Sequence, residues 1–154
     1  MSEETRSKVF ISHGHDEEAR TTVAEFVENL GLNVTVLNEQ PNNDPTVIDN
    51  LERYADDTGF AIVLLTPDDV GALKDEADRQ LNPRARQNVL LELGYLIGKL
   101  NPNQVCILYK DGVELPSDIH GVVLYVPMDS ADAWKLKLSQ GMRNAGLLVD
   151  TSQV

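Results

Sequence analysis

The stretch that decides the fold reads Asn82-Pro-Arg-Ala-Arg-Gln-Asn-Val-Leu-Leu-Glu-Leu-Gly-Tyr-Leu-Ile-Gly-Lys-Leu100. Wound at about 100° per residue, it has one continuous apolar face, which is made of Val89, Leu93, Leu96 and Leu100. Such a face predicts a helix that packs against a hydrophobic core. Asn82 is a good N-cap and Pro83 suits a first helical turn, so we expect the helix to run from Pro83 to Leu100.

Glu92 lies at the margin of this apolar face, where a carboxylate would be half desolvated while facing a cleft. It is therefore a candidate catalytic group. Periodicity alone favours the plainer interpretation of a solvated glutamate, because Glu is a good helix former. Gly94 and Gly98 lie four residues apart on another face, and this spacing predicts close contact with another backbone.

Short aliphatic runs alternate with helical patterns along the rest of the chain, which predicts an α/β fold with a parallel sheet. The expected strands are Lys8 to Ser12, Asn33 to Leu37, Phe60 to Leu65, Gln104 to Tyr109 and Val122 to Val126. The other expected helices are Asp16 to Leu30, Thr46 to Asp56 and Ser130 to Ala145, with Gly31 and Gly146 as stops. Right-handed crossovers then predict a five-stranded, doubly wound sheet in the flavodoxin-like order.

Composition limits the class of protein. At 154 residues the chain makes one domain, which we place at residues 8–150 between short tails at 1–7 and 151–154. The net charge of −12 disfavours nucleic acid and anionic membranes as partners. The single cysteine, Cys106, lies in an apolar run, which suits a buried thiol in a reducing compartment. With no signal-peptide pattern and no run long enough to span a membrane, we expect a cytoplasmic protein.

In a doubly wound sheet, ligands bind beyond the carboxyl ends of the strands. We therefore expect function in four loops, at residues 12–16, 38–46, 66–71 and 110–121. In the first, Gly14 would let the backbone approach a ligand and Asp16 would cap the next helix. A zinc site at His13, His15 and Asp16 is disfavoured, because neither a cysteine partner nor a His pair at helical spacing accompanies them.

Other polar residues near these loops leave alternatives open. Asp68 and Asp69 follow a buried strand, which suits either a turn or hydrogen bonds to ribose hydroxyls. Arg84 and Arg86 would contact phosphate or pair with the acidic stretch Asp75 to Asp78. The chain contains no Gly-rich phosphate cradle and no serine–histidine–acid or reactive-cysteine pattern.

Five strings stand in order along the chain. They are Lys-Val-Phe-Ile-Ser-His-Gly-His-Asp (8 to 16), Asn-Glu-Gln-Pro (38 to 41), Leu-Leu-Thr-Pro-Asp-Asp-Val-Gly (64 to 71), Arg-Ala-Arg-Gln-Asn-Val-Leu-Leu-Glu-Leu-Gly-Tyr-Leu-Ile-Gly-Lys-Leu (84 to 100) and Glu-Leu-Pro-Ser-Asp-Ile-His-Gly-Val (114 to 122). Together they resemble bacterial TIR-like domains of a predicted nucleotide-binding family, which act as effectors in STING- and CBASS-type anti-phage defence. The resemblance covers almost the whole chain. It gives a reason, which periodicity does not, to single out Glu92.

The resemblance implies an NAD glycohydrolase that cleaves the bond between nicotinamide and ribose, with Glu92 catalytic. It implies that NAD is a substrate and that no cofactor or metal is needed. The first TIR motif corresponds to Phe10–His13, and the BB loop to Asn38–Thr46. The expected substrate contacts are Phe10, Ser12, His13, Gly14, Glu39, Asp68 and Asn88, the last standing where many TIR domains have an aromatic residue.

A single carboxylate suits this chemistry, because nicotinamide is cationic in NAD and leaves as a neutral base without general-acid help. The carboxylate would stabilise the oxocarbenium-like ribosyl transition state. The resemblance also implies activation by self-association through the BB loop, driven by a fused or partner sensor. Two alternatives remain, a non-catalytic TIR interaction module and a nucleoside deoxyribosyltransferase-like enzyme.

Overall fold

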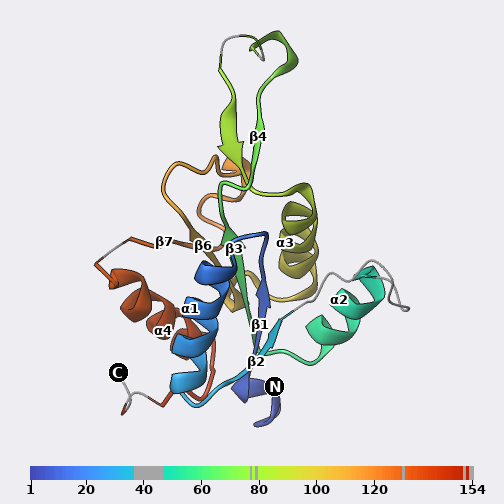
Figure 1. The fold of residues 1–154 in the computed structure, drawn as a ribbon. Helices are drawn as coiled ribbons and strands as arrows, with labels where there is room; N and C mark the ends of the chain where they lie inside the picture. Colours follow the sequence, from blue (N-terminus) through green and yellow to red (C-terminus); the bar gives the residue numbers. More distant parts are fainter. Residues whose placement is uncertain (37–46, 77, 79, 130, 151, 153–154) are drawn as a thin grey trace.

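The centre of the protein is a five-stranded parallel sheet (Figure 1). The structure is a computed structural model and describes residues 1–36, 47–76, 78, 80–129, 131–150 and 152. The strands stand in the order β2-β1-β3-β6-β7, and their bounds are Asn33–Val36, Lys8–Ser12, Phe60–Leu65, Val105–Tyr109 and Leu124–Pro127 respectively. This order confirms the predicted flavodoxin-like architecture, in which the chain reverses direction across the sheet between β1 and β3.

Two helices cover each face of the sheet. One face carries α1 (Glu17–Asn29) and α4 (Ala133–Asn144), and the other carries α2 (Val47–Asp56) and α3 (Gln87–Lys99), as Figure 1 shows. Successive residues of a strand point to opposite faces, so the sheet divides the apolar side chains into two cores. All six residues of β3 are buried, as expected for a central strand covered on both sides. Gly31 and Gly146 follow α1 and α4 with φ of 83° and 97°, which confirms both as helix stops.

Shorter elements complete the fold. Four 3-10 helices are described, at Thr5–Ser7, Lys74–Glu76, Pro102–Gln104 and Ser117–Ile119. The last lies in the segment 110–121, which otherwise has the predicted loop character. In the residues before β1, the Arg6 side chain donates a hydrogen bond to the Gly146 carbonyl at 2.7 Å. No helix among the described residues is long and apolar enough to cross a membrane.

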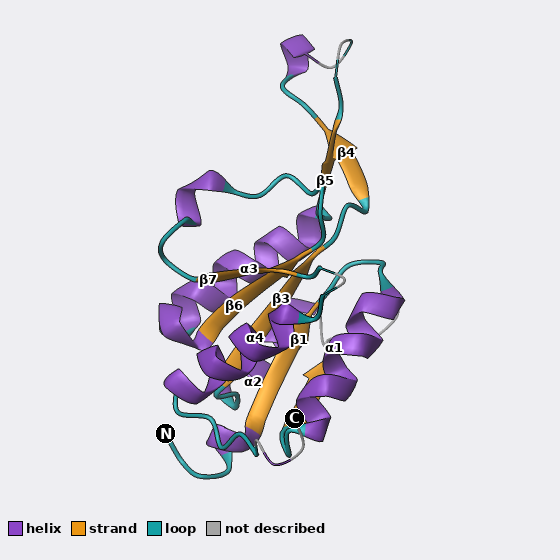
Figure 2. Ribbon diagram, turned by 90° about the vertical axis from the view of Figure 1, so that its left-hand side faces the viewer, coloured by secondary structure: helices purple, strands orange, loops and turns teal. Residues whose placement is uncertain are grey.

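The predicted start of the glutamate helix is wrong. Asn82–Arg84 forms strand β5, which pairs antiparallel with β4 (Asp69–Gly71), and α3 begins only at Gln87. The physical reason is Pro83, because a proline disfavours helical backbone at the residue before it and is tolerated at the edge of a two-stranded ribbon. This hairpin projects from the domain in Figure 2.

The predicted backbone contact at Gly94 and Gly98 is also not found within the part of the chain that the structure describes. A Cβ added to either glycine would meet no atom within 4 Å among the described residues, other than the backbone of the helix itself. Both glycines are exposed. Both glycines therefore lie on the outer face of α3, where no other described element packs against them.

Cys106 is the second residue of β6 and is fully buried, as predicted. Burial raises the pKa of its thiol to about 12, so the reactive thiolate is scarce at neutral pH. We expect the native protein to resist a thiol-specific reagent such as DTNB, and the urea-unfolded chain to react fully. Rapid labelling of the native protein would contradict this placement.

Candidate active site

Glu92 and Ser12 meet at the carboxyl end of β1. Ser12 is the last residue of β1, and its side chain points to the same face as Phe10, two residues earlier, towards α3. Its hydroxyl donates a hydrogen bond to Oε2 of Glu92. Ser12 is 0% exposed and Glu92 is 3% exposed.

Glu92 is thus more deeply buried than its position at the helix margin predicts. It stands next to the buried Val89 and Leu96 on the surface of α3, and this part of the helix faces the end of β1. Burying a carboxylate is costly unless hydrogen-bond donors compensate for the lost water. A glutamate held in this way differs from the solvated glutamate that periodicity alone favours.

A second polar cluster surrounds Asp68, just after β3. Its Oδ2 accepts hydrogen bonds from the His15 backbone N–H at 3.0 Å and from the Thr66 hydroxyl at 2.7 Å. A Cβ added to Gly14 would lie 2.1 Å from the same oxygen. The glycine therefore allows the close approach of Asp68. Its predicted role in the approach of a ligand to the backbone stays a prediction.

The Asp68 cluster continues to the start of α3. His15 Nε2 lies 2.7 Å from Nη1 of Arg86, which occupies the N-cap position of α3. Because guanidinium only donates, His15 accepts here through a neutral ring nitrogen. The contacts join the loop after β1, the loop after β3 and the helix that carries Glu92. His15 and Arg86 were not predicted to meet.

Asp16 confirms its predicted role as the cap of α1. Its Oδ1 accepts a hydrogen bond from the Ala19 backbone N–H at 3.0 Å. Its Oδ2 lies 3.7 Å from Nζ of Lys110, which follows β6. This carboxylate therefore both begins a helix and attracts a cation from a neighbouring loop.

The other predicted substrate contacts lie in four different environments. Phe10 is fully buried in the core and packs against Tyr54 at 6.1 Å between ring centroids. His13 lies beside Ser12, with Nδ1 2.8 Å from the Gly14 carbonyl oxygen, while Asn88 is exposed one turn before Glu92. Glu39 and the whole Asn38–Thr46 loop lie outside the described residues. The structure thus brings Ser12, His13, Gly14 and Asp68 to the strand end that Glu92 faces.

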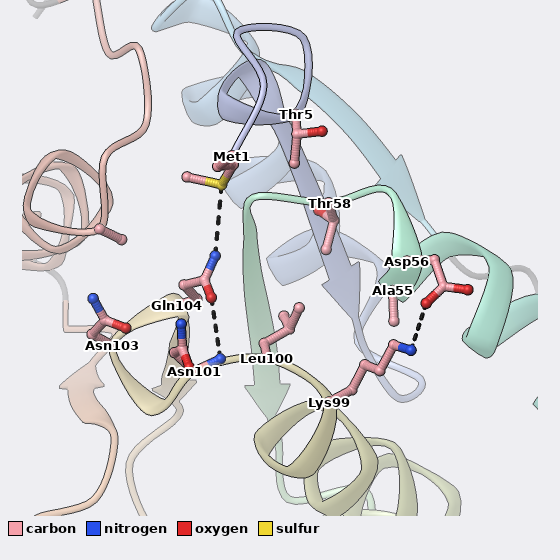
Figure 3. A pocket seen from close by; sticks show the side chains of 11 residues that line it. Met1, Thr5, Ala55, Asp56, Thr58, Lys99, Leu100, Asn101, Asn103 and Gln104 are labelled. Atoms are coloured by element: carbon pink, nitrogen blue, oxygen red, sulfur yellow. Dashed lines mark hydrogen bonds and ion pairs between the residues drawn. The ribbon is translucent and has the colours of Figure 1, made fainter.

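A hollow of about 400 Å³ lies at the opposite, amino-terminal edge of the sheet (Figure 3). Lys99 and Asp56 line it and form an ion pair at 2.6 Å. Gln104 also lines it, and its side-chain amide donates a hydrogen bond to the Gly59 carbonyl at 3.0 Å. None of the predicted site residues that the structure describes lines it. Among the described residues, no group of three or more His, Cys, Asp or Glu side chains is arranged to hold a metal ion.

Comparison with known proteins identifies the domain. The family model for the TIR domain of CAP12/Pycsar effector proteins matches residues 8–130. The chain belongs to this family. The match begins with β1 and extends past β7, so it includes all five strands of the parallel sheet.

Individual relatives of this TIR domain are longer proteins. YuaY from Escherichia coli K12 is 46% identical over 144 residues, which cover 93% of this chain and 47% of YuaY. Protein tirC from Dictyostelium discoideum is 36% identical over 126 residues, 77% of this chain and 63% of tirC. The Pycsar effector PaPycTIR from Pseudomonas aeruginosa is 34% identical over 77 residues, 49% of this chain and 24% of that protein. The TIR domain therefore spans less than two thirds of each of these relatives.

Proposed function

We propose that this TIR domain is an NAD glycohydrolase that releases nicotinamide and acts as an effector in bacterial anti-phage defence. The observation that carries the proposal is the buried Glu92 carboxylate, bonded to Ser12 at the carboxyl end of β1. Membership of the CAP12/Pycsar effector TIR family supports the same assignment. The product is ADP-ribose or a cyclic variant of it.

In the proposed reaction, the bond between the ribose C1′ and the nicotinamide nitrogen breaks, and its electron pair leaves with nicotinamide, which becomes neutral. Positive charge then builds on the ribose. The Glu92 carboxylate stabilises this charge, and its low exposure strengthens the effect because little water screens it. Water adds to C1′ and gives up a proton, which yields ADP-ribose and H⁺.

Ser12 acts in this scheme as a positioning residue, because its hydroxyl holds one oxygen of Glu92. We expect Ser12→Ala to lower kcat by roughly 10- to 100-fold with little change in KM, since losing a hydrogen bond to a buried charged group costs about 1.5–3 kcal/mol. Steady-state nicotinamide release would measure this effect. The matched control is Ser139→Ala, another buried serine, which lies on α4 away from the site. Equal losses in the two variants would contradict the role of Ser12.

The proposal includes activation by self-association, with a fused or partner sensor bringing TIR domains together. The TIR resemblance implies that the Asn38–Thr46 loop of one copy completes the site of another. A chain of charge −12 repels identical copies at low concentration. We expect the activity per molecule to rise with protein concentration, as measured by nicotinamide release over a dilution series. A constant specific activity would show that one subunit suffices.

Product analysis separates the proposal from its alternatives. Concentrated protein is incubated with NAD, or with a deoxynucleoside and a free base, and the products are resolved by chromatography. The proposal predicts nicotinamide and ADP-ribose, or its cyclic form, from NAD alone. Base exchange on the deoxynucleoside would favour the deoxyribosyltransferase alternative. No turnover of either substrate, even when the protein is clustered, would favour a non-catalytic interaction module.

A further inference from the structure

The β4–β5 hairpin, described at residues 69–76, 78 and 80–84, extends away from the body of the domain and is called the arm here (Figures 1 and 2). It exposes three large apolar side chains, with Val70 64%, Leu73 69% and Leu81 52% accessible. Large apolar side chains exposed on a projecting hairpin are candidates for contact with a partner. The described residues of the tip also include three carboxylates, Asp75, Glu76 and Asp78, and one cation, Lys74.

The base of the arm is fixed to the domain. Arg84 forms an ion pair with Glu114 at 3.0 Å, and the Glu114 N–H donates to the Pro83 carbonyl at 2.8 Å. A Cβ on Gly71 would lie 2.7 Å from Nη1 of Arg84, so the glycine lets this side chain cross the hairpin. An anchored arm presents its tip in a defined direction, which lowers the entropy cost of docking.

A complementary surface lies on the outer side of α4. It consists of Leu136, Lys137, Gln140 and Arg143, all exposed, and is called the α4 face here. Leu136 is 60% accessible and lies at the amino-terminal end of this face. In a chain of charge −12, α4 carries Lys135, Lys137 and Arg143 and no acidic residue, whereas each other described α-helix carries at least one. Both views place α4 well away from the tip of the arm.

We propose that the arm of one copy docks on the α4 face of a second copy. Leu73 then packs against Leu136, while Glu76 and Asp78 approach Lys137 and Arg143. The two surfaces are different parts of the chain, so each copy can offer an arm and accept another. Such a head-to-tail contact does not close on itself, and it builds an open row of domains. The inference rests on the self-association part of the proposed function and names the contact for it, but it does not depend on NAD cleavage.

The test measures the size of the assembly by sedimentation velocity at low and high micromolar protein, without NAD. We expect the native chain to form concentration-dependent oligomers. Leu73→Asp, which disables the arm, and Leu136→Asp, which disables the α4 face, should each weaken association by at least about tenfold. Both side chains are mostly exposed, so neither change disturbs the core. The matched control is Leu91→Asp on α3, at a leucine that is 59% exposed and outside both surfaces.

Mixing the two disabled variants gives the sharpest result. The Leu73→Asp chain still has an α4 face and the Leu136→Asp chain still has an arm, so the mixture should form one-to-one pairs that do not grow. Three outcomes would overturn the proposal: a native chain that stays monomeric throughout, disabled variants that assemble like the native chain, or a Leu91→Asp control that loses association to the same extent. Because no outcome is read from activity, failure here leaves the NAD glycohydrolase proposal standing.

Discussion

Glu92→Gln is expected to lower the rate of NAD cleavage by about a hundredfold or more while the protein stays folded. Glutamine has nearly the same shape, so the buried site keeps its packing and can still bond to the Ser12 hydroxyl. It has no negative charge to stabilise the ribosyl cation. Steady-state nicotinamide release gives the rate, and circular dichroism with thermal unfolding gives the fold.

The control for this variant is Glu25→Gln, which removes the same charge from an exposed position on α1. It should retain the native rate within about a factor of two, because an exposed surface charge far from the reaction contributes little. Turnover by Glu92→Gln close to that of this control would remove Glu92 from the catalytic role.

Gly14→Ala is expected to disrupt the site by a different route. The new methyl group would lie 2.1 Å from the Asp68 carboxylate, so Asp68 has to move and lose its hydrogen bonds from His15 and Thr66. We expect the free energy of unfolding to fall by about 1–3 kcal/mol and kcat/KM to fall by at least roughly tenfold. Urea denaturation and nicotinamide release measure the two effects.

Gly98→Ala is the matched control for Gly14→Ala. A Cβ there meets no atom of the described residues within 4 Å apart from the backbone of the helix itself, and alanine is favoured over glycine inside a helix by roughly 0.5–1 kcal/mol. This variant should therefore be slightly more stable and equally active. If Gly14→Ala were as stable and active as Gly98→Ala, the contact with Asp68 would not require glycine at position 14.

The parallel sheet and its helices were predictable because their signals are local and repeated. The apolar run of β3 and the apolar face of α3 each identify one element, and right-handed connections then limit the order of the strands. The arm was missed for a local reason as well. Its strands are three residues each, and Asn82-Pro83 resembles the start of a helix as much as the end of a hairpin.

The contacts within the site were less accessible to sequence reasoning. Ser12 and Glu92 were each singled out, and alternation along β1 places Ser12 on the face that α3 covers. The meeting of His15 with Arg86 depends on how two loops pack, and no sequence period encodes it. The roles of the predicted substrate contacts stay predictions, Glu39 and the Asn38–Thr46 loop among them.

The most direct test of the central claim is the amount of free nicotinamide formed from NAD by the concentrated native chain, compared with Glu92→Gln at the same concentration. The account predicts that nicotinamide appears in equal amount to the NAD consumed, and that the variant forms almost none. NAD that remains intact with the concentrated or artificially clustered native chain, or nicotinamide release that persists in the variant, would contradict it.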